Sequence, residues 1–228
     1  MIRSQIENLK YNWKDYLLKY DELIKNIDDK LKIEKSTYEP SLKILPPDNL
    51  IFNSFNHFDF DKLKVVFIGQ DCYHGKGQAN GLCFSVPEDM KKTPPSLRNI
   101  FKELHNDLGI LRTKTDFTDL ANQGILFLNT SLTVREKCPE SHMEFWLPYT
   151  TEILKDISNN SDQIIFVLWG NYAKSKKKYI DCNKHYILEA KHPSPLSANR
   201  GGFFGCKHFS KINSKLTEWG KIPIQWDS

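Results

Sequence analysis

The sequence predicts a single α/β domain with a four-stranded central parallel sheet flanked by helices on both faces. Two observations support this fold class. From residue 62 onward four short apolar runs follow one another, LKVVFIG, GILFLN, QIIFVLWG and HYILEA. Helix-like stretches separate or follow these runs, near residues 96–108, 146–158, 170–180 and 207–219. Strands that alternate with helices form parallel sheets covered on both faces, so we expect each run to be one strand.

The first part of the chain is patterned as a helix. Between residues 5 and 34 apolar side chains recur at helical spacing, which predicts an amphipathic helix broken once. The apolar positions are Ile6, Leu9, Trp13, Tyr16, Leu17, Tyr20, Leu23, Ile24, Ile27 and Leu31. Residues 39–49 contain Pro40, Pro46 and Pro47. Because proline cannot continue a helix, this segment is expected to be a crossing loop.

The length and composition fit one globular domain. A chain of 228 residues can bury a substantial core, and its 39% hydrophobic and 26% charged residues are ordinary for a folded protein. We expect one domain, residues 1–228, with an N-terminal helical region (1–61) and an α/β core (62–228) that would carry any catalytic groups. No apolar run is long enough to span a membrane, and the N-terminus lacks the pattern of a secretory signal. An intracellular protein without membrane association is therefore expected.

The cysteines and the charge give little support to a metal site. The five cysteines are odd in number and scattered, so reduced thiols are expected rather than disulfides. Cys72 with His74, and Cys206 with His208, are possible pairs of zinc ligands, but zinc sites usually show tighter paired spacings. We therefore expect neither a metal nor another cofactor. The formal net charge of +4 permits an anionic partner without requiring one.

Polar residues follow all four predicted strands. They are Gln70 and Asp71 after the first run, Asn129 at the end of the second, Gly170 and Asn171 after the third, and His192 and Ser194 after the fourth. Parallel sheets place ligand chemistry beyond the carboxyl ends of their strands, so these residues are expected to meet at one edge. For any one of them the simpler alternative is that a polar residue caps a buried strand.

Five segments of the chain carry distinctive motifs. The first is GQDCYHGKGQANGLCFSV (69–86). The others are PPSLRNI (94–100), GILFLNTSLTV (124–134), FVLWGNYAKSK (166–176) and HPSPLSANRGGFFGCKHFS (192–210). These segments resemble family 1 uracil-DNA glycosylases, in the order in which that family carries them, and the first resembles the family's water-activating loop. Together with the intervening stretches they cover about two thirds of the chain. The part without such support is mainly the N-terminal helical region.

The resemblance implies a monofunctional, metal-independent hydrolase that flips deoxyuridine out of DNA and releases free uracil, leaving an abasic site for base excision repair. Asp71 matches the carboxylate that stabilises positive charge on the sugar and places a water. His192 matches the histidine that donates a hydrogen bond to O2 of the departing uracil. The resemblance implies no lyase activity.

The resemblance also assigns a uracil pocket. Tyr73 matches the aromatic wall that excludes the 5-methyl group of thymine. Asn129 matches the amide that donates to O4 and accepts from N3–H, a pattern that cytosine cannot satisfy. Phe84 matches the ring on which the base stacks, and Gln70 lies where further contacts to uracil are expected.

DNA contacts are implied for three short loops and one apolar side chain. Pro95 and Ser96 match the proline-rich loop, Gly170 and Asn171 the glycine-serine loop, and Ser194 the serine-proline loop, all of which would meet phosphates. Leu196 matches the wedge that enters the base stack. The implied partners are uracil-containing single- and double-stranded DNA, with a proteinaceous inhibitor or a replication partner as further candidates. A monomer is expected, located wherever the DNA is: the cytoplasm of a bacterium, otherwise a nucleus or viral replication site.

The sequence departs from the family pattern at a few positions. Cys72 stands where proline is usual, Asn80 where histidine is common, Asn171 where the glycine-serine loop has serine, and one extra glycine occurs at 201–202. These departures concern loop shape and DNA affinity, and none removes Asp71, Asn129 or His192.

Two other functions are alternatives: a DNA-binding module without catalysis, and a thiol hydrolase. A DNA-binding module that has lost catalysis would have no need to keep a carboxylate, an amide and an imidazole. A thiol hydrolase would use Cys72 activated by His74. Residues i and i+2 of an extended loop point apart, which makes that pairing geometrically poor.

Overall fold

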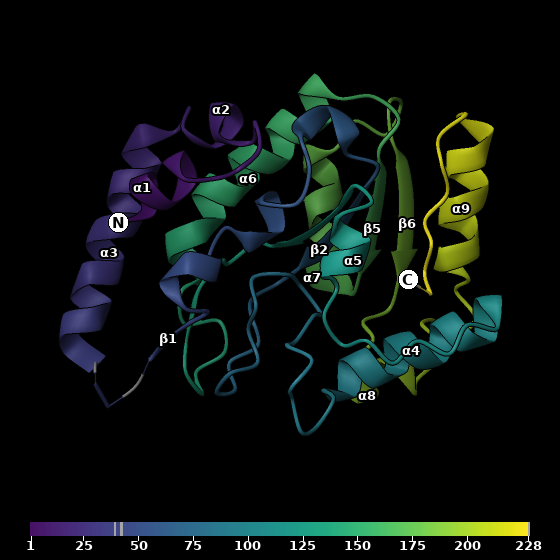
Figure 1. The fold of residues 1–228 in the computed structure, drawn as a ribbon, viewed down its shortest axis with the longest axis horizontal. Coiled ribbons are helices and arrows are strands. Elements are labelled where there is room, and N and C mark those ends of the chain that lie inside the picture. Colours follow the sequence, from purple (N-terminus) through teal and green to yellow (C-terminus); the bar gives the residue numbers. More distant parts are fainter. Residues whose placement is uncertain (39, 42, 228) are drawn as a thin grey trace.

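The four predicted strands form one parallel sheet in a computed structural model that describes residues 1–38, 40–41 and 43–227 (Figure 1). The strands are β2 (Val65–Gly69), β3 (Ile125–Asn129), β5 (Ile165–Trp169) and β6 (Tyr186–Ala190), and their order in the sheet is β3-β2-β5-β6. All three strand pairings are parallel. The predicted fold class is therefore confirmed, and the carboxyl ends of all four strands lie at one edge.

The two faces of the sheet are covered by different helices, because successive side chains of a strand point to opposite faces. On β2, Val66 and Ile68 belong to a core shared with the N-terminal helices, whereas Val65 and Phe67 pack in a second core with the C-terminal helix. Figure 1 shows α3 (Asp21–Tyr38) and α6 (Met143–Asn160) on one side of the sheet and α9 (His208–Glu218) on the other.

The helices of the core follow the predicted stretches with two differences. The predicted helix at 96–108 is α4 (Pro95–Leu108), and the one at 207–219 is α9. The stretch 170–180 is not one helix: α7 (Asn171–Lys174) gives way to a 3-10 helix, η4 (Ser175–Tyr179). Two short helices, α5 (Thr118–Ala121) and α8 (Pro195–Ala198), were not expected.

The N-terminal helix was predicted with one break but has two, which separate α1 (Ile2–Glu7), α2 (Lys14–Leu17) and α3. The first break is made by contacts with a distant segment. The backbone N–H of Lys10 donates to the Asn56 side chain at 2.9 Å, and that of Asn12 donates to Asp59 at 3.0 Å. These N–H groups bond to side chains more than 45 residues away, so helical spacing alone could not reveal the break.

Short elements connect the N-terminal helices to the sheet. They are β1 (Ile44–Leu45) and the 3-10 helices η1 (Asp48–Leu50), η2 (Asn53–Phe55) and η3 (Phe60–Lys62). β1 pairs antiparallel with β4 (Val134–Arg135), so the expected crossing loop at 39–49 contains a short strand. Residues 39 and 42 of that predicted loop lie outside the described residues. In the described part of the chain, no helix is both long and apolar enough to cross a membrane.

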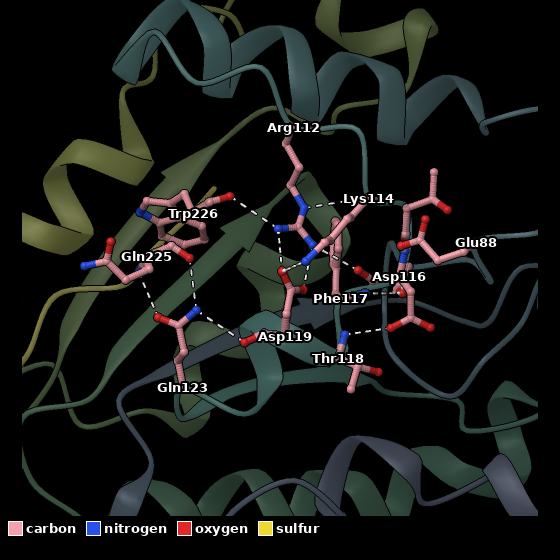
Figure 2. Close-up of polar contacts among 12 residues, drawn as sticks. Glu88, Arg112, Lys114, Asp116, Phe117, Thr118, Asp119, Gln123, Gln225 and Trp226 are labelled. Carbon is pink, nitrogen blue, oxygen red and sulfur yellow. Dashed lines mark hydrogen bonds and ion pairs between the residues drawn. The ribbon is translucent and has the colours of Figure 1, made fainter. Parts of the chain in front are cut away.

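Arg112 joins the C-terminal segment to the loop that follows α4 (Figure 2). Its buried guanidinium makes two bonds to the Asp119 carboxylate, at 2.6 and 2.9 Å. It also donates to the backbone carbonyls of Lys114, Asp116 and Trp226 at 2.9 to 3.3 Å. This arrangement satisfies a buried cation with oxygen partners from residues 114–119 and from the C-terminal segment.

Candidate active site

A cavity of about 220 Å³ lies at the carboxyl edge of the sheet. Its lining includes both predicted catalytic residues and all four predicted uracil contacts, Asp71, His192, Gln70, Tyr73, Phe84 and Asn129, together with Ser96. The six predicted residues come from three strand ends and from the loop that follows β2, and Ser96 comes from the first turn of α4. The topology thus gathers side chains that are up to 122 positions apart, the separation between Gln70 and His192.

A second cavity, of about 410 Å³, adjoins the first and shares Gln70, Phe84 and His192 with it. Three of the predicted DNA-contacting residues line it: Gly170, Asn171 and Leu196. Lys191 and Arg200 also line it and give it a basic rim. Pro95 and Ser194 line neither cavity; each lies where a helix begins, Pro95 on α4 and Ser194 before α8.

Asp71 is held by one backbone donor. Its Oδ2 accepts a hydrogen bond from the Glu140 N–H at 2.7 Å. Burial raises the pKa of the carboxyl above its usual value, although the Glu140 N–H and the nearby His74 act in the opposite direction. The carboxylate therefore faces the cavity in a partly desolvated state, where it interacts strongly with positive charge.

The structure favours a neutral His192 ring that carries its proton on Nε2. Its Nδ1 accepts a hydrogen bond from the Ser194 N–H at 3.0 Å, so the proton of the neutral ring is on Nε2. Burial lowers the pKa of the imidazole, which favours this neutral form. Close packing orients the ring: a side chain at Gly170, whose φ is +94°, would press on the His192 Cβ at 3.0 Å. Glycine is therefore required at 170 for conformation and for space.

Asn129 reaches the cavity because Gly69 has no side chain. The two residues are register partners at the ends of β3 and β2, and a Cβ at Gly69 would collide with Oδ1 of Asn129. Nδ2 of Asn129 lies 3.6 Å from the Cys72 sulfur. The amide is buried, so its polar atoms need partners that a bound base could supply.

Two aromatic side chains form the apolar walls. Phe84 has a left-handed backbone, with φ of +65°, which is rare for a bulky residue and is found mainly where function requires it. Its ring centroid lies 5.5 Å from that of Trp169 and 5.9 Å from that of His192. The Tyr73 hydroxyl is buried, and the described residues offer it no hydrogen-bond partner.

Asn80 supports the loop that carries Phe84. Its Nδ2 donates to the Ser85 hydroxyl at 2.7 Å and to Asp116 at 3.1 Å, while its Oδ1 accepts from the Leu82 N–H at 3.3 Å. Asp116 is the residue whose carbonyl Arg112 also binds, so this loop is connected to the network of Figure 2. The sequence marked Asn80 only as a departure from the family, and its supporting role was missed.

Cys72 does not fit a nucleophile. The side chain is buried, and its sulfur lies 3.3 Å from the Leu132 carbonyl. Burial raises the pKa of the thiol, so the reactive thiolate is disfavoured. The other cysteine considered for zinc, Cys206, lies against Glu103, and His208 accepts a bond from Trp169 Nε1 at 2.9 Å. Within the described ranges no group of three or more His, Cys, Asp or Glu side chains could hold a metal ion.

Comparison with known proteins identifies the family. A model of the uracil DNA glycosylase superfamily matches residues 55–217. The uracil-DNA glycosylase of Campylobacter hominis is 49% identical over 98% of this chain and 95% of its own length. That of Campylobacter curvus is 53% identical over 81% of this chain and 79% of its own length.

Solved structures agree with this result. The mimivirus uracil-DNA glycosylase has a TM-score of 0.81 and 29% identity, and covers 92% of this chain and 86% of its own. A mimivirus UNG variant in complex with UGI has a TM-score of 0.88 and 29% identity, and covers 96% of this chain and 89% of its own. On this evidence the chain belongs to the uracil DNA glycosylase superfamily.

Proposed function

We propose that the chain is a uracil-DNA glycosylase, which hydrolyses the bond between uracil and deoxyribose in DNA and leaves an abasic site for base excision repair. The observation that carries this proposal is that one cavity gathers Asp71, Asn129 and His192 from separate strand ends. A carboxylate, an amide and a neutral imidazole are the groups that this reaction requires. The many relatives that carry this enzyme name support the same conclusion.

The bond breaks with positive charge growing on the sugar and negative charge on uracil. Asp71 would stabilise the sugar cation and position the attacking water, because a partly desolvated carboxylate acts more strongly than one in bulk water. His192 would donate its Nε2–H to O2 of the departing uracil anion. The Ser194 N–H supports that role, since it occupies Nδ1 and leaves Nε2 as the donor.

Base selection would use the remaining residues of the cavity. Asn129 would donate to O4 and accept from N3–H, which cytosine would leave unpaired. Tyr73 would exclude the thymine methyl group, and Phe84 would stack on the base while Gln70 adds polar contacts. The left-handed backbone at Phe84 supports a functional position for that ring.

DNA would bind across the adjoining basic cavity. Gly170 and Asn171 line it, and we assign phosphate contacts to them and to Pro95, Ser96 and Ser194 at the two neighbouring helix starts. Leu196 would be the wedge: it is 79% exposed, so its apolar side chain is available to enter a base stack. We further propose action on single- and double-stranded DNA.

Several wider features belong to the same proposal. We propose that the chain works as one domain and a monomer. The relatives named above are bacterial, which favours the bacterial cytoplasm as its location. A mimivirus UNG variant has been solved in complex with UGI. We propose that a protein inhibitor can also bind this chain, at the edge that we assign to DNA.

One assay separates catalysis from binding alone. The purified protein, with EDTA present, is mixed with a labelled oligonucleotide containing one deoxyuridine, and free uracil and alkali-labile strand breaks are measured. The proposal predicts both products, and no cleavage before alkali is added. Tight binding of the oligonucleotide without uracil release would instead support a DNA-binding module.

A further inference from the structure

The catalytic carboxylate is supported by a loop from another part of the chain. Residues 136–142, which we call the Asp71-facing loop, follow β4 and contact the segment after β2 at two points. The Glu140 N–H donates to Asp71 Oδ2 at 2.7 Å, and the Lys137 N–H donates to the His74 carbonyl at 2.9 Å. The position of this loop therefore decides where the donor to Asp71 lies.

The conformation of the Asp71-facing loop is unusual. Lys137 and Glu140 both have left-handed backbones, with φ of +63° and +65°. Such conformations are unfavourable for residues other than glycine and persist where surrounding contacts impose them. One internal contact helps, since the Arg135 N–H donates to the Ser141 hydroxyl at 2.8 Å. A loop of this shape also needs an anchor outside itself.

Glu34 lies against both ends of the loop and is hydrogen-bonded to one of them. This residue of the N-terminal helix α3 is only 6% exposed. Its carboxylate accepts from Arg135 Nε and, at 2.9 Å, from a terminal guanidinium nitrogen of the same residue. Its Oε1 also lies 3.1 Å from His142 Nε2, a close approach without hydrogen-bond geometry. Arg135 precedes the loop and His142 is its last residue, so one carboxylate bonds to the start of the loop and packs against its end.

The surroundings of Glu34 fix its charge and orientation. Burial opposes ionisation of the carboxyl, but the nearby Arg135 and His142 outweigh it and lower the Glu34 pKa. His142 is fully buried, and burial lowers its pKa, so it is expected to be neutral. Its Nδ1 lies 2.9 Å from the Thr133 hydroxyl, and its Nε2 is the ring nitrogen nearer Glu34. Buried ion pairs often add little stability over apolar packing, which favours a positioning role for this one.

We propose that Glu34 is a positioning residue for Asp71: it fixes the Asp71-facing loop so that the Glu140 N–H meets the catalytic carboxylate. The inference rests on the proposed function and extends it to the N-terminal helices, which the family motifs did not reach. Glu34 lies 37 positions from Asp71 in sequence, and its positioning effect reaches Asp71 through the loop.

The test compares Glu34→Ala with a matched control, Glu22→Ala, which removes an exposed carboxylate from the same helix. Single-turnover uracil release is measured at saturating enzyme, with binding of a duplex carrying a non-hydrolysable 2′-fluoro deoxyuridine. We expect Glu34→Ala to slow release about 10- to 100-fold, because small misplacements of catalytic groups cost this much. Binding should be unchanged, and Glu22→Ala should match the parent protein in both measurements.

Rescue and pH dependence exclude a merely structural role. Glu34→Gln keeps an oxygen that Arg135 can donate to, so it should recover part of the rate. Loss of the Glu140 N–H bond should raise the Asp71 pKa and move the acid limb of the rate profile to higher pH. Among the other groups around Asp71, His74, Cys72 and Tyr172 are the same in all variants. The Glu140 carboxylate moves with the loop, but its charge raises the Asp71 pKa less than its N–H lowers it, so the net shift remains upward. Removal of the negative charge of Glu34 would by itself lower the Asp71 pKa through space. An upward shift of the Asp71 pKa therefore identifies the loss of the Glu140 N–H bond.

The outcomes are distinct. A folded Glu34→Ala protein with the parent rate and acid limb overturns the inference, as does a shift of the acid limb to lower pH or a Glu34→Gln protein that is no faster than a slowed Glu34→Ala. If Glu34→Ala does not fold, a rate loss and upward shift in Glu34→Gln still support it. Absence of uracil release from the parent protein and from Glu22→Ala would overturn the proposed function itself, and the inference with it.

Discussion

Burial favours the uncharged form of both proposed catalytic side chains. It raises the pKa of Asp71 and lowers that of His192. The Glu140 N–H acts against this effect at Asp71, and the Ser194 N–H, which donates to Nδ1, agrees with the neutral ring of His192. The proposed reaction needs ionised Asp71 and neutral His192, and each of these forms predominates at a pH above the pKa of its own group. Activity should therefore fall as the pH is lowered, because both residues become protonated.

Asp71 should reduce the stability of the protein at neutral pH. Its folded pKa is raised, so any stabilisation it gives exists at low pH and is lost as the pH rises through that pKa. We expect Asp71→Asn to unfold at a higher temperature than the parent at pH 7, and the difference to vanish at acidic pH where the carboxyl is protonated. Thermal unfolding at several pH values measures this, with the exposed Asp61→Asn as control. A lower Tm for Asp71→Asn at pH 7 would show that the carboxylate is favourably solvated.

Cys72 should be inert to thiol reagents in the folded protein, because its side chain is buried and its thiol is held protonated. The exposed Cys182 should react first. Brief treatment with a maleimide, followed by peptide mass spectrometry, should find Cys182 modified, Cys72 unmodified and uracil release unchanged. Rapid labelling of Cys72 with parallel loss of activity would contradict the structure and bring back the thiol mechanism.

Among the elements, α8 is one of the shortest helices and yet presents the largest exposed apolar side chain of the site, Leu196. An exposed leucine contributes little to the core, so it can change without loss of stability. The helix start is fixed by Pro195 at its first turn and by the Ser194 N–H bond to His192. The proposed wedge and the proposed electrophile are thus carried on one short, rigid segment.

Leu196→Ala should slow uracil release from duplex DNA by about tenfold or more, because loss of apolar contact in the base stack costs on the order of 1 to 3 kcal/mol. Single-stranded substrate should be affected much less, since only a duplex needs its base held out. Single-turnover rates on the two substrates give the ratio. Equal losses on both, accompanied by a lower Tm, would identify a structural leucine.

Helices and strands were predicted correctly from the sequence where the residue pattern that marks them is local. The four strands were found because each is a short apolar run between helical stretches, and α4 and α9 because their apolar spacing is regular. The sequence predicted one break in the N-terminal helix without locating it, whereas the structure has two. The break after α1 depends on bonds from Lys10 and Asn12 to side chains far along the chain, which helical spacing does not reveal. The Asp71-facing loop was missed for the same reason: its donor to Asp71 is a backbone N–H, which no residue type reveals.

At the scale of the whole molecule, the N-terminal helices are part of the core. Trp13 is fully buried, its Nε1 donates to the Phe58 carbonyl at 2.8 Å, and its ring contacts Phe55 and Phe60 at centroid distances of 5.2 and 5.0 Å. The same apolar cluster continues to one face of the sheet. Through Glu34 the helices also reach toward the active-site edge.

Trp13→Ala should therefore destabilise the entire protein. We expect a loss of about 3 to 5 kcal/mol in the free energy of unfolding, the usual cost of deleting a buried aromatic side chain. Urea unfolding followed by circular dichroism measures it, and Trp219→Ala, at a half-buried site, is the matched control. A single transition shifted to lower urea is expected. A variant that loses only local helical signal while the sheet unfolds at the parent midpoint would show that the N-terminal region folds separately.

We assign the breaking of the uracil–sugar bond to Asp71 and His192 in the cavity at the carboxyl edge of the sheet. Single-turnover uracil release by the parent, Asp71→Asn and His192→Ala tests this directly, with DNA binding measured in parallel. We predict full binding in all three proteins and a loss of about 10²- to 10³-fold in rate for each variant, the usual cost of removing one preorganised electrostatic partner. Rates near that of the parent in either variant would contradict the assignment of that residue.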